Sequence, residues 1–210
     1  MLHVGIVAEG SSDCLVLESI MKVIHNDIDF LRLQPDQTLA VTKPNGWRGV
    51  RAWCQEFGPN LDFFMRSVTP KLDLLIIHSD CSMADKENAE KPCPPAEATA
   101  TSLREVILLN WLRLSASPGF VIIVTPSKST DAWVVASLDP VYKKLNTIEC
   151  DFAAEDELVK RRLLPRKDGE VKKQTRRYTP LANSVASHIG RVCGFCRQAS
   201  VFYDEFSSKL

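Results

Sequence analysis

Three short apolar runs limit the folds open to this chain more than any other feature. They occupy residues 4–8, 72–78 and 120–124 and are rich in Ile, Val and Leu. Such runs are typical of strands that a parallel sheet buries on both faces. Helices are expected between and after them, at residues 13–24, 46–65, 101–114, 131–138 and 180–210. This alternation predicts a mostly parallel α/β sheet with helices on both faces. A further short strand is expected at residues 39–42.

Acidic residues follow the predicted strands. Glu9 follows the first run, Asp80 the second, and Asp131 lies shortly after the third. The carboxyl ends of parallel strands share one edge of the sheet, where open α/β folds bind ligands, so these side chains are expected to converge. Asp13, four residues after Glu9, can face the same cleft. Paired carboxylates at such an edge suit a hard cation such as Mg²⁺.

Each candidate also has a purely structural interpretation. Glu9 and the serines after it can cap the following helix, and Asp80 can cap the segment after its strand. Asp131 can be an acid in the first turn of a helix, where the helix dipole favours it. His78 suits a buried strand end as well as a place in the site.

Composition indicates an ordinary globular chain. Of its 210 residues 45% are hydrophobic and 25% charged, and its formal net charge of zero indicates no particular partner. No stretch approaches the roughly 20 apolar residues of a membrane span, and Glu9 and Asp13 interrupt the only early apolar run. We therefore expect a cytoplasmic protein with no membrane association, whose seven cysteines are reduced thiols.

Two cysteines, Cys193 and Cys196, form a lone Cys-x-x-Cys pattern near the C-terminus. A structural zinc site needs four ligands, and no second pair has suitable spacing. The pattern is interpreted as a joint between two helices with both thiols packed.

Positive charge is concentrated in residues 160–177, which contain nine Lys and Arg residues and only two acids, Asp168 and Glu170. We expect a basic hairpin or loop around a turn at residues 168–169 that contacts the phosphates of DNA or RNA. The alternative is a solvated loop paired with acids elsewhere in the chain. The candidate nucleic-acid-binding residues are Lys160, Arg161, Arg162, Arg166, Lys167, Lys172, Lys173, Arg176 and Arg177.

Three motifs in order resemble those of TOPRIM domains, especially in overcoming-lysogenization-defect nucleases and small proteins of bacterial defence loci. Residues 7–13 resemble the Glu-Gly-x-x-Asp opening of that family, and residues 78–82 fall where it carries Asp-x-Asp. Residues 127–133 resemble its later segment of serine followed by an acid. The resemblance covers about residues 1–140.

The resemblance implies a TOPRIM-like fold that binds Mg²⁺ (or Mn²⁺) and cleaves phosphodiesters. Glu9 would be a metal ligand or general base, Asp13 a second ligand and Asp80 the central ligand. Asp131 would be a ligand or would position water. From its place beside these acids, Lys128 is a candidate to stabilise phosphoryl charge, the alternative being an exposed lysine of the loop. Two cations in such a site can stabilise both the attacking and the leaving oxygen. An ATPase partner and a role in anti-phage defence are also implied.

One residue departs from the family pattern. Ser82 stands at the second acid of Asp-x-Asp, and Asp85 is a candidate substitute from the following loop. Two functions therefore stay open: a Mg²⁺-dependent nuclease, or a catalytically weakened binding or regulatory subunit. Nucleotide binding is a third, although the chain lacks a P-loop motif. Residues 1–145 are assigned to the TOPRIM-like domain, and residues 146–210 to a basic loop and helical extension packed on it.

Overall fold

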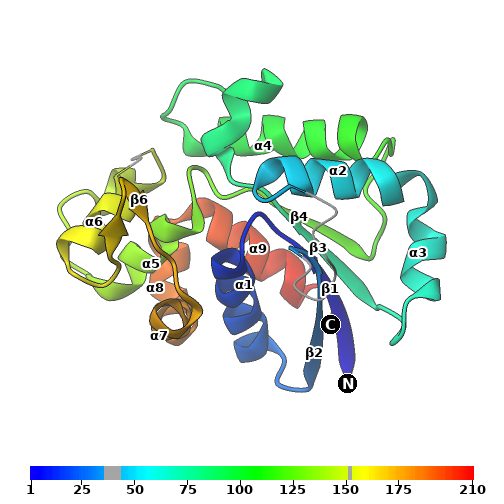
Figure 1. The fold of residues 1–210 in the computed structure, drawn as a ribbon, viewed down its shortest axis with the longest axis horizontal. Helices are drawn as coiled ribbons and strands as arrows, with labels where there is room; N and C mark the ends of the chain where they lie inside the picture. Colours follow the sequence, from blue (N-terminus) through cyan, green and yellow to red (C-terminus); the bar gives the residue numbers. More distant parts are fainter. Residues whose placement is uncertain (36–43, 151–152) are drawn as a thin grey trace.

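The fold is a parallel four-stranded sheet between two layers of helices (Figure 1). The computed structural model describes residues 1–35, 44–150 and 153–210. The sheet has the order β2-β1-β3-β4, and every neighbouring pair is parallel. The predicted α/β class with a parallel sheet is thereby confirmed. The strands are β1 (Leu2–Val7), β2 (Ile28–Gln34), β3 (Leu74–His78) and β4 (Val121–Val124).

Three of these strands lie where the apolar runs predicted them, whereas β2 was not expected. It forms the edge of the sheet beside β1, and most of its residues are only half-buried. Asp29 and Arg32 interrupt its apolar residues, so its sequence resembles a polar connection more than a buried strand. The strand predicted at residues 39–42 lies outside the described residues.

Alternate side chains of the central strands enter two separate cores. Leu74 and Ile76 of β3 pack on one face of the sheet, and Leu75 and Ile77 pack on the other. Because both faces are covered by helices, these positions must all be apolar, which explains the unbroken runs.

One helical layer contains segments from both ends of the chain. The first helix and the C-terminal helices contribute side chains to one core, so residues 154–206 pack on the same sheet face as the first helix. Its helices are α1 (Ser11–Ile24), α5 (Thr130–Leu138), α6 (Ala154–Lys160), α7 (Thr175–Ser187), α8 (Ile189–Phe195) and α9 (Arg197–Ser207).

The opposite layer is formed by the middle of the chain. It contains α2 (Trp47–Phe57), α3 (Leu61–Ser67) and α4 (Ala96–Val106), the last continuing as a π-helical turn, η3 (Ile107–Trp111). Short 3₁₀ segments are η1 (Gly58–Asn60), η2 (Cys81–Glu87) and η4 (Leu145–Cys150). Within the described residues, no helix has the length and apolar composition needed to cross a bilayer.

The basic segment forms the hairpin that its sequence predicted. Strands β5 (Arg166–Lys167) and β6 (Glu170–Val171) pair antiparallel. Asp168 and Gly169 between them have φ angles of 54° and 80°. Two consecutive left-handed residues suit a tight hairpin turn, for which Asp-Gly is a favoured pair.

The cysteines differ from expectation at one pair. Cys93 and Cys150 form a disulfide, with their Cα atoms 5.8 Å apart, so the prediction that all seven are thiols is wrong for these two. The prediction followed from the expected compartment, and it could not show that the loop after η2 lies against η4. The other five cysteines are free. Cys196 is buried between α8 and α9, as the predicted helix joint requires.

Candidate metal centre

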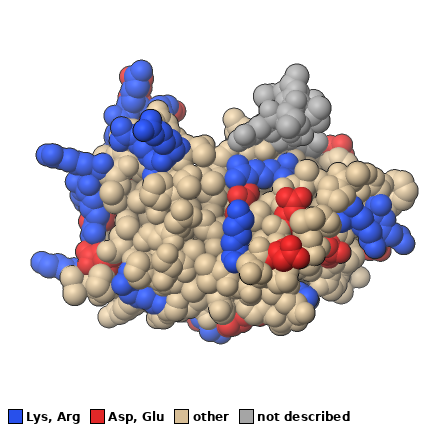
Figure 2. Space-filling model, turned by 90° about the horizontal axis from the view of Figure 1, so that it is seen from below, with Lys and Arg blue, Asp and Glu red and all other residues tan. Residues whose placement is uncertain are grey.

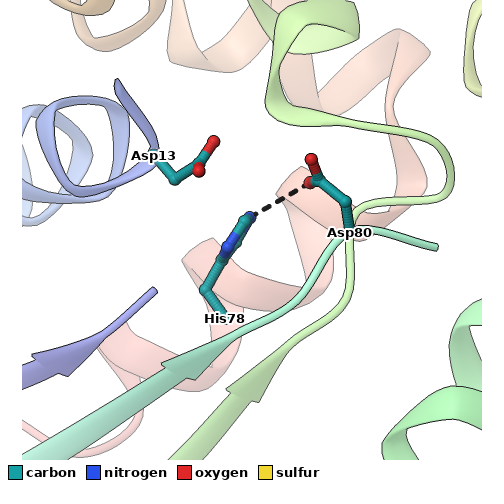
Figure 3. A group of neighbouring side chains, drawn as sticks. All are labelled: Asp13, His78 and Asp80. Atoms are coloured by element: carbon teal, nitrogen blue, oxygen red, sulfur yellow. Dashed lines mark ion pairs between the residues drawn. The ribbon is translucent and has the colours of Figure 1, made fainter. Parts of the chain in front are cut away.

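Asp13, His78 and Asp80 come together at the carboxyl edge of the sheet. Asp13 lies in the first turn of α1, His78 ends β3, and Asp80 follows two residues later. Each offers a ligand atom, and these atoms lie within 4.8 Å of one another. Figure 3 shows the three side chains facing one another. Sequence reasoning brought Asp13 and Asp80 to this edge and left His78 undecided.

His78 is the most unusual member of this group. Its side chain is fully buried, and its Nε2 lies 3.3 Å from Asp80 Oδ1. These two atoms form an ion pair without the geometry of a hydrogen bond, and within the described residues the other ring nitrogen, Nδ1, has no hydrogen-bond partner. Burial disfavours a charged imidazole, but the Asp13 and Asp80 carboxylates outweigh burial and raise the pKa of His78 to about 9. Because buried polar atoms nearly always have partners, these atoms fit a site for a cation.

Asp13 is held in place by a neighbouring helix. Thr130, the first residue of α5, donates its Oγ1 hydrogen to Asp13 Oδ1 over 2.6 Å. A Cβ added at Gly10 would lie 3.3 Å from Asp13 Oδ2, so a larger residue there would crowd this oxygen. The hydrogen bond from Thr130 therefore orients the carboxylate that faces His78 and Asp80.

Glu9 lies beside the group and contacts it through the backbone. Its Oε1 accepts hydrogen bonds from Ser79 Oγ at 2.7 Å and from the Asp80 amide at 2.8 Å. Burial and the nearby Asp80 charge raise the pKa of Glu9 to about 7. Burial likewise raises the pKa of Asp80 to about 6. Glu9 can therefore hold or release a proton near neutral pH.

Asp131 is paired within the protein. Its Oδ1 accepts a hydrogen bond from Tyr178 Oη at 2.7 Å, and its Oδ2 accepts one from Lys173 Nζ at 2.6 Å. Lys173 also lies 3.2 Å from Glu155. Burial disfavours the charge on Lys173, but Asp131 outweighs it and raises the Lys173 pKa well above its usual range. The structure thus places Asp131 in an ion pair next to the group.

The residues around the second predicted acid are exposed or have partners of their own. Ser82 is exposed on η2, and its amide donates to the Lys128 carbonyl. Asp85, the candidate substitute, is exposed and pairs with Lys86 at 2.6 Å. Lys128 is itself buried in the loop between β4 and α5.

Four of the nine candidate nucleic-acid contacts are paired with acids. Arg161 pairs with Asp139 and Glu157, and Lys173 pairs as described above. Arg166 pairs with Asp156, and Lys172 with Glu170. In the part of the chain that the structure describes, the other five side chains are exposed and make no ion pair or hydrogen bond: Lys160, Arg162, Lys167, Arg176 and Arg177.

Figure 2 shows Lys and Arg side chains projecting from the end of the molecule where Figure 1 places α6 and the β5–β6 hairpin, and others lie elsewhere on the same face. The hairpin is connected to the metal group because Lys173, two residues after β6, contacts Asp131 beside Thr130. Lys173 is also near enough to favour the charged form of Asp80.

Sequence reasoning did not identify Tyr178 as a partner of Asp131, and it left open whether His78 belongs to the group. Residues two apart at a strand end lie on the same side, so His78 and Asp80 shared a signal for convergence. Tyr178 has no such local signal, because it meets Asp131 only through the packing of α7 on α5. Comparisons of the chain with protein-family models, with curated proteins and with solved structures found no match.

Proposed function

We propose that this protein is a divalent-metal-dependent phosphodiesterase that cleaves nucleic acid. The observation that carries the proposal is the group of Asp13, His78 and Asp80, whose candidate ligand atoms lie within 4.8 Å of one another at the carboxyl edge of the sheet. The motif resemblance to TOPRIM domains supports the same chemistry, with Mg²⁺ or Mn²⁺ as the cation. A cation held there would act as a Lewis acid on a phosphoryl oxygen.

Glu9 is the proposed general base. Hydrogen bonds from Ser79 and the Asp80 amide orient its carboxylate beside the metal group. From this position a carboxylate can accept a proton from an attacking water. The proton would then reside on a carboxyl that burial already stabilises in its neutral form.

The five unpaired cations are the proposed contacts to the nucleic-acid backbone. Exposed Lys and Arg side chains neutralise phosphates without reading sequence. The Lys173–Asp131 ion pair holds the basic hairpin beside the metal group, so a strand bound along the hairpin would pass near Asp13 and Asp80.

The remaining parts of the proposal rest on the resemblance. They are a TOPRIM-like identity for the fold, a cytoplasmic role in bacterial anti-phage defence, and action beside an ATPase partner. The Cys93–Cys150 disulfide is unusual for a cytoplasmic protein, so this location is best tested together with the state of that pair.

A cleavage assay with two matched variants tests the proposed function. Purified full-length protein is incubated with single- and double-stranded DNA and RNA in Mg²⁺ or Mn²⁺. Asp80→Asn is expected to reduce cleavage at least about 100-fold, because it removes a charge from the metal group. Asp85→Asn makes the same chemical change on an exposed residue and should leave cleavage unchanged. Equal cleavage by wild type and Asp80→Asn would contradict the proposal.

A second candidate function is a TOPRIM-like subunit that binds nucleic acid without cleaving it. Two observations favour it: Ser82 supplies no carboxylate, and both oxygens of Asp131 are paired. On this account wild type binds nucleic acid but does not cleave it, and Ser82→Asp gains divalent-cation affinity by calorimetry. A Ser82→Asp variant with unchanged cation affinity would count against the loss of a ligand at this position.

A further inference from the structure

The nitrogen donor of His78 distinguishes this group from an ordinary cluster of carboxylates. The imidazole is fully buried between the end of β3 and the first turn of α1, and neither nitrogen makes a hydrogen bond within the described residues. The Nε2 atom lies 3.3 Å from Asp80 Oδ1, an ion pair that a metal ion held between the two side chains would replace.

The donor set has a known preference among cations. Mg²⁺ selects oxygen ligands in a strict octahedron and keeps several waters. Imidazole nitrogen suits first-row transition metals, and a mixed set of imidazole and carboxylates occurs in sites for such metals. Here one nitrogen and two carboxylates converge, and the Asp80 side chain retains 15% exposure.

We propose that His78 is a metal ligand and that the site consequently takes a first-row transition-metal dication in preference to Mg²⁺. The proposal rests on the metal site proposed above and names its cofactor class. It also assigns His78 a role that the motif resemblance did not supply, since the resemblance pointed to carboxylates alone. Asp13 and Asp80 then provide the charge, and His78 provides the selectivity.

Metal titrations of the full-length protein test this assignment without any activity measurement. Binding of Mn²⁺, Co²⁺ and Mg²⁺ is followed by calorimetry, and Co²⁺ also by its visible absorption, which reports a nitrogen ligand. We expect wild type to bind Co²⁺ and Mn²⁺ at least about tenfold more tightly than Mg²⁺. Similar affinity for all three ions, or no binding of Co²⁺ and Mn²⁺, would overturn the proposal.

Two variants of His78 and one control locate the effect. His78→Asn should lower Co²⁺ affinity at least about tenfold and shift the absorption bands. His78→Asp supplies an all-oxygen set and should move the preference toward Mg²⁺. His188→Asn changes an exposed histidine and should behave as wild type. Unchanged Co²⁺ affinity in His78→Asn overturns the proposal, as does Mg²⁺ binding that appears only when His78 is removed, because His78 would then act as a built-in cation.

The two proposals can fail separately. If Co²⁺ binds through His78 but no nucleic acid is cleaved, the proposed nuclease function fails and the ligand assignment stands. If Asp80→Asn abolishes Mg²⁺-dependent cleavage while His78→Asn leaves both cleavage and Co²⁺ affinity unchanged, the function stands and the ligand assignment fails. The wild-type ranking of metals keeps the test decisive even where a His78 variant folds poorly.

Discussion

Glu9, His78 and Asp80 share one electrostatic property: each binds its proton more tightly in the folded protein than in an unfolded chain. The pKa of Glu9 rises from 4.5 to about 7 and that of Asp80 from 3.8 to about 6, both mainly through burial. The pKa of His78 rises from 6.5 to about 9, because the neighbouring carboxylates outweigh its burial. Raised pKa values of this kind favour the folded state at low pH and lose that contribution as pH rises.

The first prediction concerns the pH dependence of stability without metal. In EDTA, the free energy of unfolding should fall as pH rises from about 3.8 to about 9, over the interval between the unfolded and folded pKa values of these groups. Glu9→Gln should flatten the part of the curve between pH 4.5 and about 7. Thermal unfolding across this range measures the effect, with Glu90→Gln as an exposed control. A Glu9→Gln curve parallel to wild type would contradict the account.

At the residue scale, the sequence was informative where function depends on position along a strand. The convergence of Asp13 and Asp80 follows from the shared edge of a parallel sheet. The pairing of Asp131 with Lys173 and Tyr178, 42 and 47 residues away, depends on how α7 packs and has no signature in the local sequence.

At the scale of elements, the Lys173–Asp131 ion pair helps to hold the segment that follows the β5–β6 hairpin. The Asp131 side chain is 2% exposed and the Lys173 side chain 26%. Removing the lysine leaves a buried carboxylate with Tyr178 as its remaining partner among the contacts described above. A buried charge that loses its partner is costly, although the partial exposure of Lys173 moderates the effect.

The second prediction tests this ion pair. Lys173→Met should lower the free energy of unfolding in urea by about 2 kcal/mol. Lys172→Met removes the adjacent lysine, whose partner Glu170 is exposed, and should change stability by less than about 1 kcal/mol. Asp131→Asn in the Lys173→Met background should restore part of the loss. Equal effects of the two lysine substitutions would show that the pair at Asp131 does not hold this segment.

The third prediction concerns the Cys93–Cys150 disulfide, which joins residues 57 apart in the sequence. Closing a loop of this length restricts the unfolded chain, so reduction should lower the free energy of unfolding by about 2–4 kcal/mol. Urea unfolding with and without dithiothreitol measures the change. Cys93→Ser should already be destabilised and should not respond to dithiothreitol. A wild-type midpoint that is insensitive to dithiothreitol would contradict the prediction.

Elements buried on both faces were predictable, and elements at the margin were not. The strands β1, β3 and β4 are apolar throughout because helices cover both faces of the sheet. The edge strand β2 has Asp29 and Arg32 among its apolar residues, and the sheet register rather than composition identifies it. The disulfide likewise depends on tertiary proximity, which spacing alone does not reveal.

For the whole molecule, the distribution of charge is more informative than its sum. The chain has no formal net charge, yet five exposed and unpaired cations lie in residues 160–177. Neutral composition therefore gave no indication of a partner, whereas the local excess of Lys and Arg did. Of the nine candidate nucleic-acid-binding residues, four are paired with acids in the structure, which leaves five as candidates.

The fourth prediction follows from this charge distribution. Binding to duplex DNA in Ca²⁺ or EDTA should weaken with salt, with a slope of log affinity against log salt no steeper than about −4.5, since five phosphates at most are neutralised. Replacing Arg162 and Lys167 with Gln should reduce the slope by about 2. Lys209→Gln, an exposed change at the C-terminus, should leave it unchanged. A slope that does not respond to the double substitution would place the interface elsewhere.

The central claim is that Asp13, His78 and Asp80 hold one cation between them. Anomalous diffraction from a crystal soaked in Mn²⁺ tests it most directly. The account predicts an anomalous peak within about 2.0–2.6 Å of a carboxylate oxygen of each aspartate and of a ring nitrogen of His78. A Mn²⁺-soaked crystal with no peak at this position, and with the His78 ring hydrogen-bonded to Asp80 instead, would contradict it.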